Sequence, residues 1–220
     1  MSAMRPRLVL HHSVAIDGAV QGFELDPASH YGALGELEAG GFLVDADVAL
    51  EGIGEVPAET EADRAPRSID PADARAIWFV VDARGALEGK LHVVRRYQIK
   101  DVVVIGCAST PASYRQWLAV RHYRFHEAGR DEVDLARALE LVRAEHGVER
   151  LVTDVGRRLT AELFAAGVVD ELSLLVFPNL VVGTSDRWFA ELRAAVQLDL
   201  ADAWALESGA IHLRWTVRRP

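Results

Sequence analysis

The chain has 220 residues and a mass of 24.1 kDa, the size of one ordinary domain or two small ones. Half of its residues are hydrophobic and 26% are charged, which excludes a disordered or fibrous chain. Twenty-four Lys and Arg against 33 Asp and Glu give a formal net charge of −9, which argues against a nucleic-acid or membrane-surface partner. No apolar stretch is long enough for a signal peptide or a membrane span, so we expect a cytoplasmic protein.

The first half of the chain alternates apolar runs with helical and polar segments. Four runs predict strands: Arg7–Val14, Ala46–Leu50, Ala76–Val81 and Val102–Ile105. Ala28–Ala39 has helical composition and ends at a Gly-Gly pair, whereas Glu51–Ser68 is rich in Pro, Glu and Gly and predicts a surface loop. Leu91–Arg96 fits either a minor strand or the end of a helix.

The second half continues the alternation more clearly. Asp134–His146 has apolar residues at 135, 138, 139 and 142, the spacing of one helix face, with Asp134 as N-cap and Gly147 after the last turn. A strand is expected at Glu149–Thr153, a helix at Arg157–Ala166 and a second strand at Glu171–Phe177. The tail predicts a terminal hairpin around Ser208-Gly209, with strands at Ala195–Leu206 and Ala210–Val217. This order predicts a single α/β domain over residues 1–220, with three layers, a mostly parallel sheet and a C-terminal antiparallel hairpin.

The junction between the expected strand at 149–153 and the helix at 157–166 is a candidate anion site. A buried strand ends there, Gly156 allows close backbone approach, and the first N–H groups of the helix lack helical partners. Arg157 and Arg158 add positive charge beside them. The alternative is a plain strand-to-helix turn with two solvated arginines.

Asp17 and Gly18 close the first strand, at the carboxyl edge of the expected sheet. Ligands of open α/β sheets bind at that edge, so Asp17 and Gly18 are candidate ligand contacts. The alternative is an ordinary turn, because Asp-Gly is a common turn pair.

The histidines and the lone cysteine give little support for a metal site. Cys107 is the single cysteine and forms neither an internal disulfide nor a thiolate zinc site. His122 and His126 have a helical zinc spacing, but their surroundings predict an extended segment that separates the rings. His11 and His12 are adjacent on a strand and point to opposite faces, so we expect one of them to be a hydrogen-bonded core histidine.

Several segments together resemble a known family. They are SVAIDG at 13–18, DVALEGIGE at 47–55, VVDARG at 80–85 and LVTDVGRRLTAELFAAGVVDELSLLVFPNLVVG at 151–183. This order is similar to the reductase domain of riboflavin biosynthesis, the C-terminal half of the bifunctional deaminase-reductase. The resemblance covers roughly residues 8–217 and implies a dihydrofolate-reductase-like fold and an NADPH-dependent reduction of a pyrimidine ribosylamino-phosphate or a related heterocycle.

The resemblance also assigns roles to individual residues. Asp17 and Gly18 match the loop beside the nicotinamide and substrate, which makes both candidate substrate-binding residues and Asp17 the candidate catalytic residue. The Val81–Arg84 segment matches the part that holds the adenosine end, so Arg84 is the candidate contact for a 2′-phosphate. The cofactor-binding residues that it implies are Gly52, Glu55, Glu59, Asp82, Arg84, Gly106, Val155, Gly156, Arg157, Arg158 and Leu159. A homodimer built through sheet edges and the C-terminal hairpin is also implied.

Some positions depart from the family pattern. Val155 replaces a glycine of the usual Glu-Gly-Gly turn, Glu55 stands where threonine is usual, and Ala15 where serine is common. Glu59 replaces an aspartate. These departures indicate a divergent member, and they leave a second function open, that of a non-catalytic ligand-binding or dimeric interaction protein.

Overall fold

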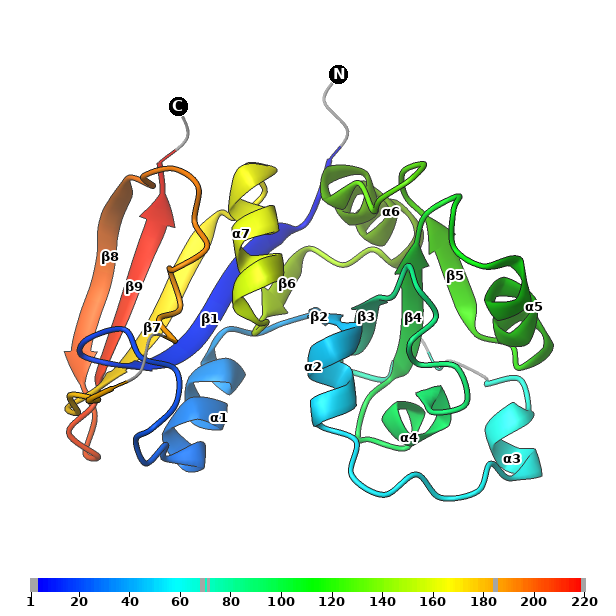
Figure 1. Cartoon of the computed structure of the whole chain (residues 1–220), viewed down its shortest axis with the longest axis horizontal. Helices are drawn as coiled ribbons and strands as arrows, with labels where there is room; N and C mark the ends of the chain where they lie inside the picture. The colour runs from blue at the N-terminus through cyan, green and yellow to red at the C-terminus, as the bar shows by residue number, and fades with distance from the viewer. Residues whose placement is uncertain (1–3, 68–69, 71, 184–185, 219–220) are drawn as a thin grey trace. The chain divides into compact units, whose positions relative to one another are not determined.

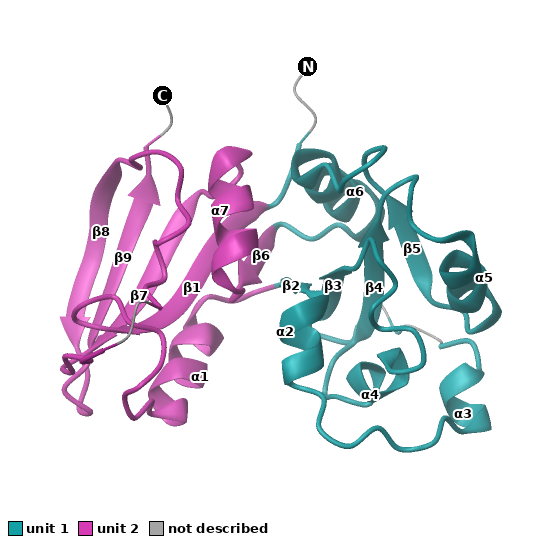
Figure 2. Cartoon of the chain, viewed as in Figure 1, with its two compact units in different colours: residues 1–6, 40–149 teal, residues 7–39, 150–220 magenta. Residues whose placement is uncertain are grey.

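The computed structural model describes residues 4–67, 70, 72–183 and 186–218. The chain divides into two compact units, shown in different colours in Figure 2. Unit 1 comprises Met1–Pro6 and Gly40–Glu149, and unit 2 comprises Arg7–Ala39 and Arg150–Pro220. The expectation of a single domain over 1–220 stays a prediction.

Unit 1 contains a parallel sheet in the order β5-β4-β3-β2. Its strands are β2 (Gly41–Asp45), β3 (Ile77–Val81), β4 (Asp101–Gly106) and β5 (Arg124–Glu127). Its helices are α2 (Ala46–Glu51), α3 (Glu61–Arg64), α4 (Leu91–Arg95), α5 (Ala112–Val120) and α6 (Leu135–His146). Every residue of β4 is buried, as its continuous apolar run predicts for a central parallel strand.

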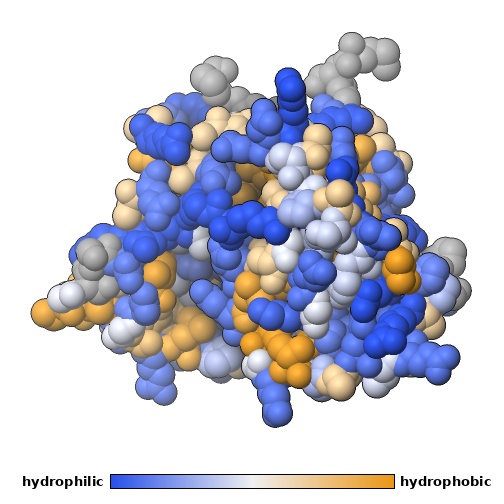
Figure 3. All heavy atoms as spheres, turned by 45° about the vertical axis from the view of Figure 1, so that its right-hand side comes forward, coloured by the Kyte–Doolittle hydropathy of each residue, from blue (hydrophilic) through white to orange (hydrophobic). Residues whose placement is uncertain are grey.

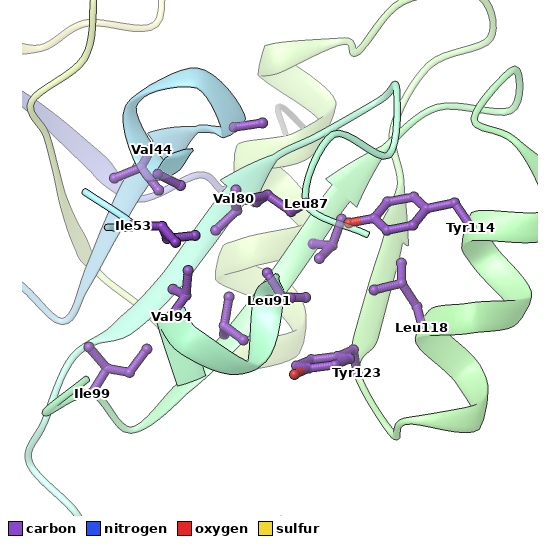
Figure 4. Packing of buried hydrophobic residues seen from close by; sticks show 14 residues of the cluster. Val44, Ile53, Val80, Leu87, Leu91, Val94, Ile99, Tyr114, Leu118 and Tyr123 are labelled. Atoms are coloured by element: carbon purple, nitrogen blue, oxygen red, sulfur yellow. The ribbon is translucent and has the colours of Figure 1, made fainter. Parts of the chain in front are cut away.

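The core of unit 1 forms where helices pack on β3 and β4. Figure 4 shows Val80 of β3, Leu91 and Val94 of α4, and Leu118 of α5 pointing into one cluster. All four side chains are fully buried. Their burial holds in place the strands whose carboxyl ends carry the predicted site residues of the unit.

Two predictions in unit 1 are wrong, and each has a local cause. The expected strand Ala46–Leu50 is the helix α2, because the Asp45 carboxylate accepts a hydrogen bond from the backbone N–H of Val48 and so caps a helix of good helix formers. The neighbouring strand β2 lies just before it. The expected loop at 51–68, whose last residue lies outside the described part of the chain, contains the one-turn helix α3, which begins with a capping box between Thr60 and Asp63.

Two other segments are decided by the structure. Leu91–Arg95 is helical, so of the strand and the helix considered for that segment the helix is correct. Helix α5 was not predicted, although the extended segment around His126 is confirmed as β5. His122 lies in the turn before β5, with a φ of 57°.

Unit 2 combines parallel strands with an antiparallel edge. Its order is β6-β1-β7-β9-β8, in which β1 pairs in parallel with both β6 and β7, and β9 is antiparallel to β7 and β8. The strands are β1 (Arg7–Ala15), β6 (Arg150–Thr153), β7 (Glu171–Phe177), β8 (Leu198–Ala205) and β9 (Ile211–Val217). The helices are α1 (Pro27–Glu36) and α7 (Arg157–Ala165), and α7 crosses in front of the strands in Figure 1.

The fold class predicted from the sequence is confirmed. Strands and helices alternate, most strand pairs are parallel, and the tail forms the expected antiparallel hairpin. The face in Figure 3 is largely hydrophilic, with apolar atoms in separate groups. Within the described residues, no helix has the length and apolar character needed to cross a membrane.

Candidate functional site

The start of α7 lies at the end of a buried strand. Gly156 is the N-cap residue, with φ −61° and ψ 167°, and it provides no side-chain cap to the helix. A Cβ built on Gly156 would meet no atom of the described residues within 4 Å, so there is open space beside this helix start among them. Leu159 is buried and anchors the first turn. These features give an anion site of the kind that holds phosphates.

Val155 does not crowd this opening. Its side chain is 2% exposed and belongs to the core, and its carbonyl oxygen accepts a hydrogen bond from the Thr160 hydroxyl at 3.3 Å. The substitution of a glycine by valine is therefore accommodated on the buried side of the turn, away from the open space at Gly156.

The two arginines of α7 are ion-paired on the surface. Arg157 lies 3.0 Å from a carboxylate oxygen of Asp186 and 3.8 Å from Glu191, and Arg158 lies 3.2 Å from Glu162 one turn further on. Such exposed pairs contribute little stability, so a phosphate can compete for these guanidinium groups.

Asp17 and Gly18 lie in the turn after β1 and are held by a second segment of unit 2. The Arg187 guanidinium donates to the backbone oxygen of Asp17 at 2.8 Å and pairs with its carboxylate at 3.2 Å. Trp188 donates its backbone N–H to the Gly18 oxygen at 3.0 Å. Gly18 has a φ of +81°, which explains why glycine is favoured there.

Residues 186–189 also connect this turn to the other predicted residues of unit 2. Asp186 pairs with Arg157 at the start of α7, and the Trp188 ring stacks on His12 at 5.1 Å with an interplanar angle of 13°. The structure therefore brings Asp17, Gly18 and Arg157 against one segment, which the sequence analysis did not identify as part of the site.

A cluster of histidines adjoins the helix start and was not predicted as a functional feature. The Asp154 carboxylate lies 2.5 Å from His12 Nδ1 and 3.1 Å from His30 Nε2, through different oxygens. The second nitrogen of His30, Nδ1, lies 2.9 Å from the Ser13 hydroxyl. We refer to His12, His30 and Asp154 as the histidine–aspartate cluster.

Charge in this cluster resides on the carboxylate. Burial raises the pKa of the Asp154 carboxyl, but the hydrogen bonds of His12 and His30 outweigh it and hold the pKa well below its usual range. Asp154 is thus ionised at neutral pH and acts only as an acceptor, so each histidine donates an N–H to it. Both nitrogens of His30 are thus engaged, Nε2 by Asp154 and Nδ1 by the Ser13 hydroxyl.

His11 confirms the expectation of a core histidine on the opposite face from His12. It is fully buried, its Nδ1 lies 3.0 Å from the Ser173 hydroxyl, and that hydroxyl lies 2.7 Å from His212 Nε2. Burial, assisted by the nearby His30, lowers the pKa of His11 to about 3, so this ring is neutral at physiological pH. Its Nε2 is buried without a hydrogen-bond partner in the described structure.

In unit 1, Asp82, Arg84 and Gly106 gather at the carboxyl ends of β3 and β4. The Asp82 carboxylate is 2% exposed and accepts from the backbone N–H groups of Ala86 and Leu87 and from the Tyr114 hydroxyl. Its oxygens are thus occupied by the protein. Arg84 is largely exposed and pairs with Asp47 at 3.2 Å.

Gly106 serves packing in addition to any binding role. A Cβ there would lie 2.6 Å from the Phe125 ring and 2.6 Å from the Thr110 hydroxyl, so no larger residue fits.

The loop residues Gly52, Glu55 and Glu59 differ in how they are held. Gly52 ends α2, and its oxygen accepts from the Tyr97 hydroxyl at 2.9 Å. Glu55 is exposed. Glu59 is mostly buried between guanidinium groups, and the hydrogen bonds of Arg121, together with Arg64, lower the pKa of its carboxyl despite burial. Glu59 thus anchors the loop to the end of α5.

No group of three or more His, Cys, Asp or Glu side chains is arranged to hold a metal ion within the described ranges. Instead of approaching His122, His126 lies with its Nε2 2.7 Å from that of His146.

An α/β fold with an open, uncapped helix start after a buried parallel strand is typical of proteins that bind phosphorylated ligands. The family model of the RibD C-terminal domain matches residues 6–212, and the chain belongs to that family. A search of curated proteins by sequence found no match.

Solved structures show the same fold. A pyrimidine reductase-like protein from Corynebacterium diphtheriae aligns with a TM-score of 0.70 at 14% identity, over 98% of this chain and 93% of that one. The riboflavin biosynthesis reductase Rib7 of Saccharomyces cerevisiae aligns with a TM-score of 0.67 at 14% identity, over 97% and 90%. RibD of Acinetobacter baumannii gives 0.66 at 20% identity, over 97% of this chain but 58% of that one.

Proposed function

We propose that this chain is an NADPH-dependent reductase of riboflavin biosynthesis that acts on a pyrimidine ribosylamino-phosphate. Family membership supports the reaction class, since structures with this fold include proteins described as pyrimidine and riboflavin-biosynthesis reductases. The observation in the chain itself that carries the proposal is the uncapped start of α7, with open space at Gly156.

The residues of this helix start fit the phosphate part of a dinucleotide. Backbone N–H groups at the start of α7 would donate to phosphate oxygens, and Gly156 places no side chain between them and the ligand. Arg157 would add charge by exchanging its surface carboxylate partners for phosphate. The bound cofactor would supply the hydride, and the protein groups orient the reactants.

The assignments in unit 1 remain proposals. Arg84 is the candidate for a 2′-phosphate because its guanidinium is exposed and its ion pair with Asp47 lies on the surface, where such pairs are weak. For Asp82 and Gly106 any contact to cofactor would come from the backbone, since the Asp82 oxygens are occupied and Gly106 has no side chain.

We also propose that the chain works as a cytoplasmic homodimer. Strand β8 lies at the end of the unit 2 strand order, so no strand of the described residues pairs with its outer backbone edge. Leu200 on β8 is 62% exposed and Ile211 on β9 is 45% exposed. A second copy of the chain would cover these apolar side chains.

The test combines binding and turnover. Calorimetry should detect NADPH binding, and the absorbance of NADPH should fall when 5-amino-6-(5-phosphoribosylamino)uracil is added. An absence of binding heat up to millimolar NADPH, in the wild type and in Glu55→Thr alike, would reject the reductase and favour the non-catalytic alternative.

A further inference from the structure

The His12 ring is held in one orientation by two contacts, which leave one of its nitrogens available for proton exchange. Its Nδ1 lies 2.5 Å from Asp154, and its ring stacks on the buried Trp188. These two contacts fix both the position and the rotation of the ring. Because Asp154 is an ionised acceptor, it takes the Nδ1 hydrogen bond and leaves Nε2 as the nitrogen for exchange.

Only His12 in this cluster combines orientation with access to solvent. The His12 side chain is 21% exposed, whereas that of His30 is 10% exposed and has both nitrogens engaged, by Asp154 and Ser13. His11 is fully buried and neutral. The charged and titratable groups around His12 are thus Asp154 from the end of β6, His30 from α1 and His11 from its own strand.

The place of His12 in the fold relates it to the proposed cofactor site. Asp154 precedes the N-cap Gly156 by two residues, and Trp188 bonds to Gly18 in the turn after β1. The ring is therefore tied to both segments of unit 2 that the sequence assigns to ligands. Asp17, in contrast, is a carboxylate paired with Arg187 and has no proton to donate in that form.

We propose that His12 is the proton donor of the reduction, positioned by Asp154. This inference rests on the proposed function. The substrate carbon of the open-chain imine, a C=N bond, accepts the hydride and its electron pair from a reduced nicotinamide, which is thereby oxidised. The π electron pair moves to the nitrogen, which forms an N–H bond with the proton of His12 Nε2. His12 is left neutral and regains a proton from water.

Two matched substitutions separate this role from a structural one. In His12→Asn the amide nitrogen replaces Nδ1 and keeps the contact with Asp154, but the outer nitrogen is lost. In His30→Gln the amide nitrogen replaces Nε2 and keeps the other contact with the same carboxylate. We expect His12→Asn to lower kcat by roughly 10²- to 10⁴-fold with an unchanged NADPH Kd, and His30→Gln to keep kcat within a few fold. Added imidazole should partly restore turnover of His12→Ala.

A readout independent of activity is the tautomer of His12. Side-chain ¹⁵N NMR of the protein without ligand should show neutral His12 protonated at Nδ1, and Asp154→Asn should abolish this preference. Full activity of His12→Asn, equal losses in His12→Asn and His30→Gln, or protonation of neutral His12 at Nε2 would overturn the proposal. A wild-type protein that neither binds nor oxidises NADPH would instead refute the proposed function, and with it this role.

Discussion

Replacing Gly156 by aspartate should stabilise the protein and weaken NADPH binding at the same time. The φ of −61° suits any L-residue, and no atom of the described residues lies within 4 Å of the new Cβ, so the substitution causes no clash with them. An aspartate N-cap would accept a hydrogen bond from the first turn of α7, which gains a few tenths of a kcal/mol over glycine. The favourable charge at the helix start adds about 0.3–1 kcal/mol.

The expected gain in stability is therefore about 0.5–1 kcal/mol, or roughly 1–4 °C in Tm for a chain of this length. Binding should change in the opposite direction, because the new carboxylate occupies a donor and repels phosphate. Loss of one charge-assisted hydrogen bond, about 1.5–3 kcal/mol, corresponds to a roughly 10- to 100-fold weaker Kd.

The assay pairs thermal melting with NADPH calorimetry on the same samples. Gly156→Asn, which caps without charge, should show a smaller loss of affinity, and Gly156→Ala, which does not cap, should not be stabilised. Unchanged NADPH affinity in Gly156→Asp would refute the cofactor site at α7. A lower Tm would refute the conclusion that the helix start has uncapped donors.

Four further predictions use other parts of the chain. Glu55→Thr should strengthen NADPH binding in calorimetry, because it removes an exposed negative charge from the loop that the family resemblance assigns to the cofactor; weaker binding would contradict this. Asp17→Ala should lower turnover in steady-state assays while costing only a few degrees of Tm, since the Arg187 side of its ion pair is 46% exposed; full turnover would remove it from the site. Burial lowers the pKa of His146 to about 4, below its unfolded value of 6.5, so the unfolded chain binds the proton first. Stability should thus fall as pH drops from about 6.5 to 4, and melting of His146→Gln should show a shallower fall. Leu200→Asp should convert a dimer to a 24.1 kDa species in light scattering, and a wild type of that mass would refute the dimer.

Much of the fold follows from local sequence. The run VVVI gives β4, and the apolar spacing of residues 135–142 with the Asp134 cap gives α6. The candidate anion site at Gly156 was also predictable, because the end of a buried strand followed by a helix is a local pattern. The family resemblance added the residues that a local pattern does not single out, such as Arg84.

Local composition led to a wrong prediction at residues 46–50, where one capping hydrogen bond decides between strand and helix. Ala46–Leu50 is as apolar as a strand, yet the Asp45 side chain starts a helix there. The sequence contains that aspartate, but whether it caps depends on where β2 ends, and the pairing of β2 with β3 sets that point.

The sequence by itself determined the order of elements from α6 to the C-terminal hairpin, the buried strand β4 and the helix start at Gly156, because these depend on residues adjacent in the chain. Only the tertiary structure decided that His12 meets Asp154, 142 residues later. The parallel register of β1 with β6 aligns Leu10 with Thr153, so that Asp154 follows β6 beside the part of β1 that carries His12, while α1 brings His30 to the same carboxylate. Strand neighbours are chosen by the burial of whole apolar faces, which no spacing within one segment encodes.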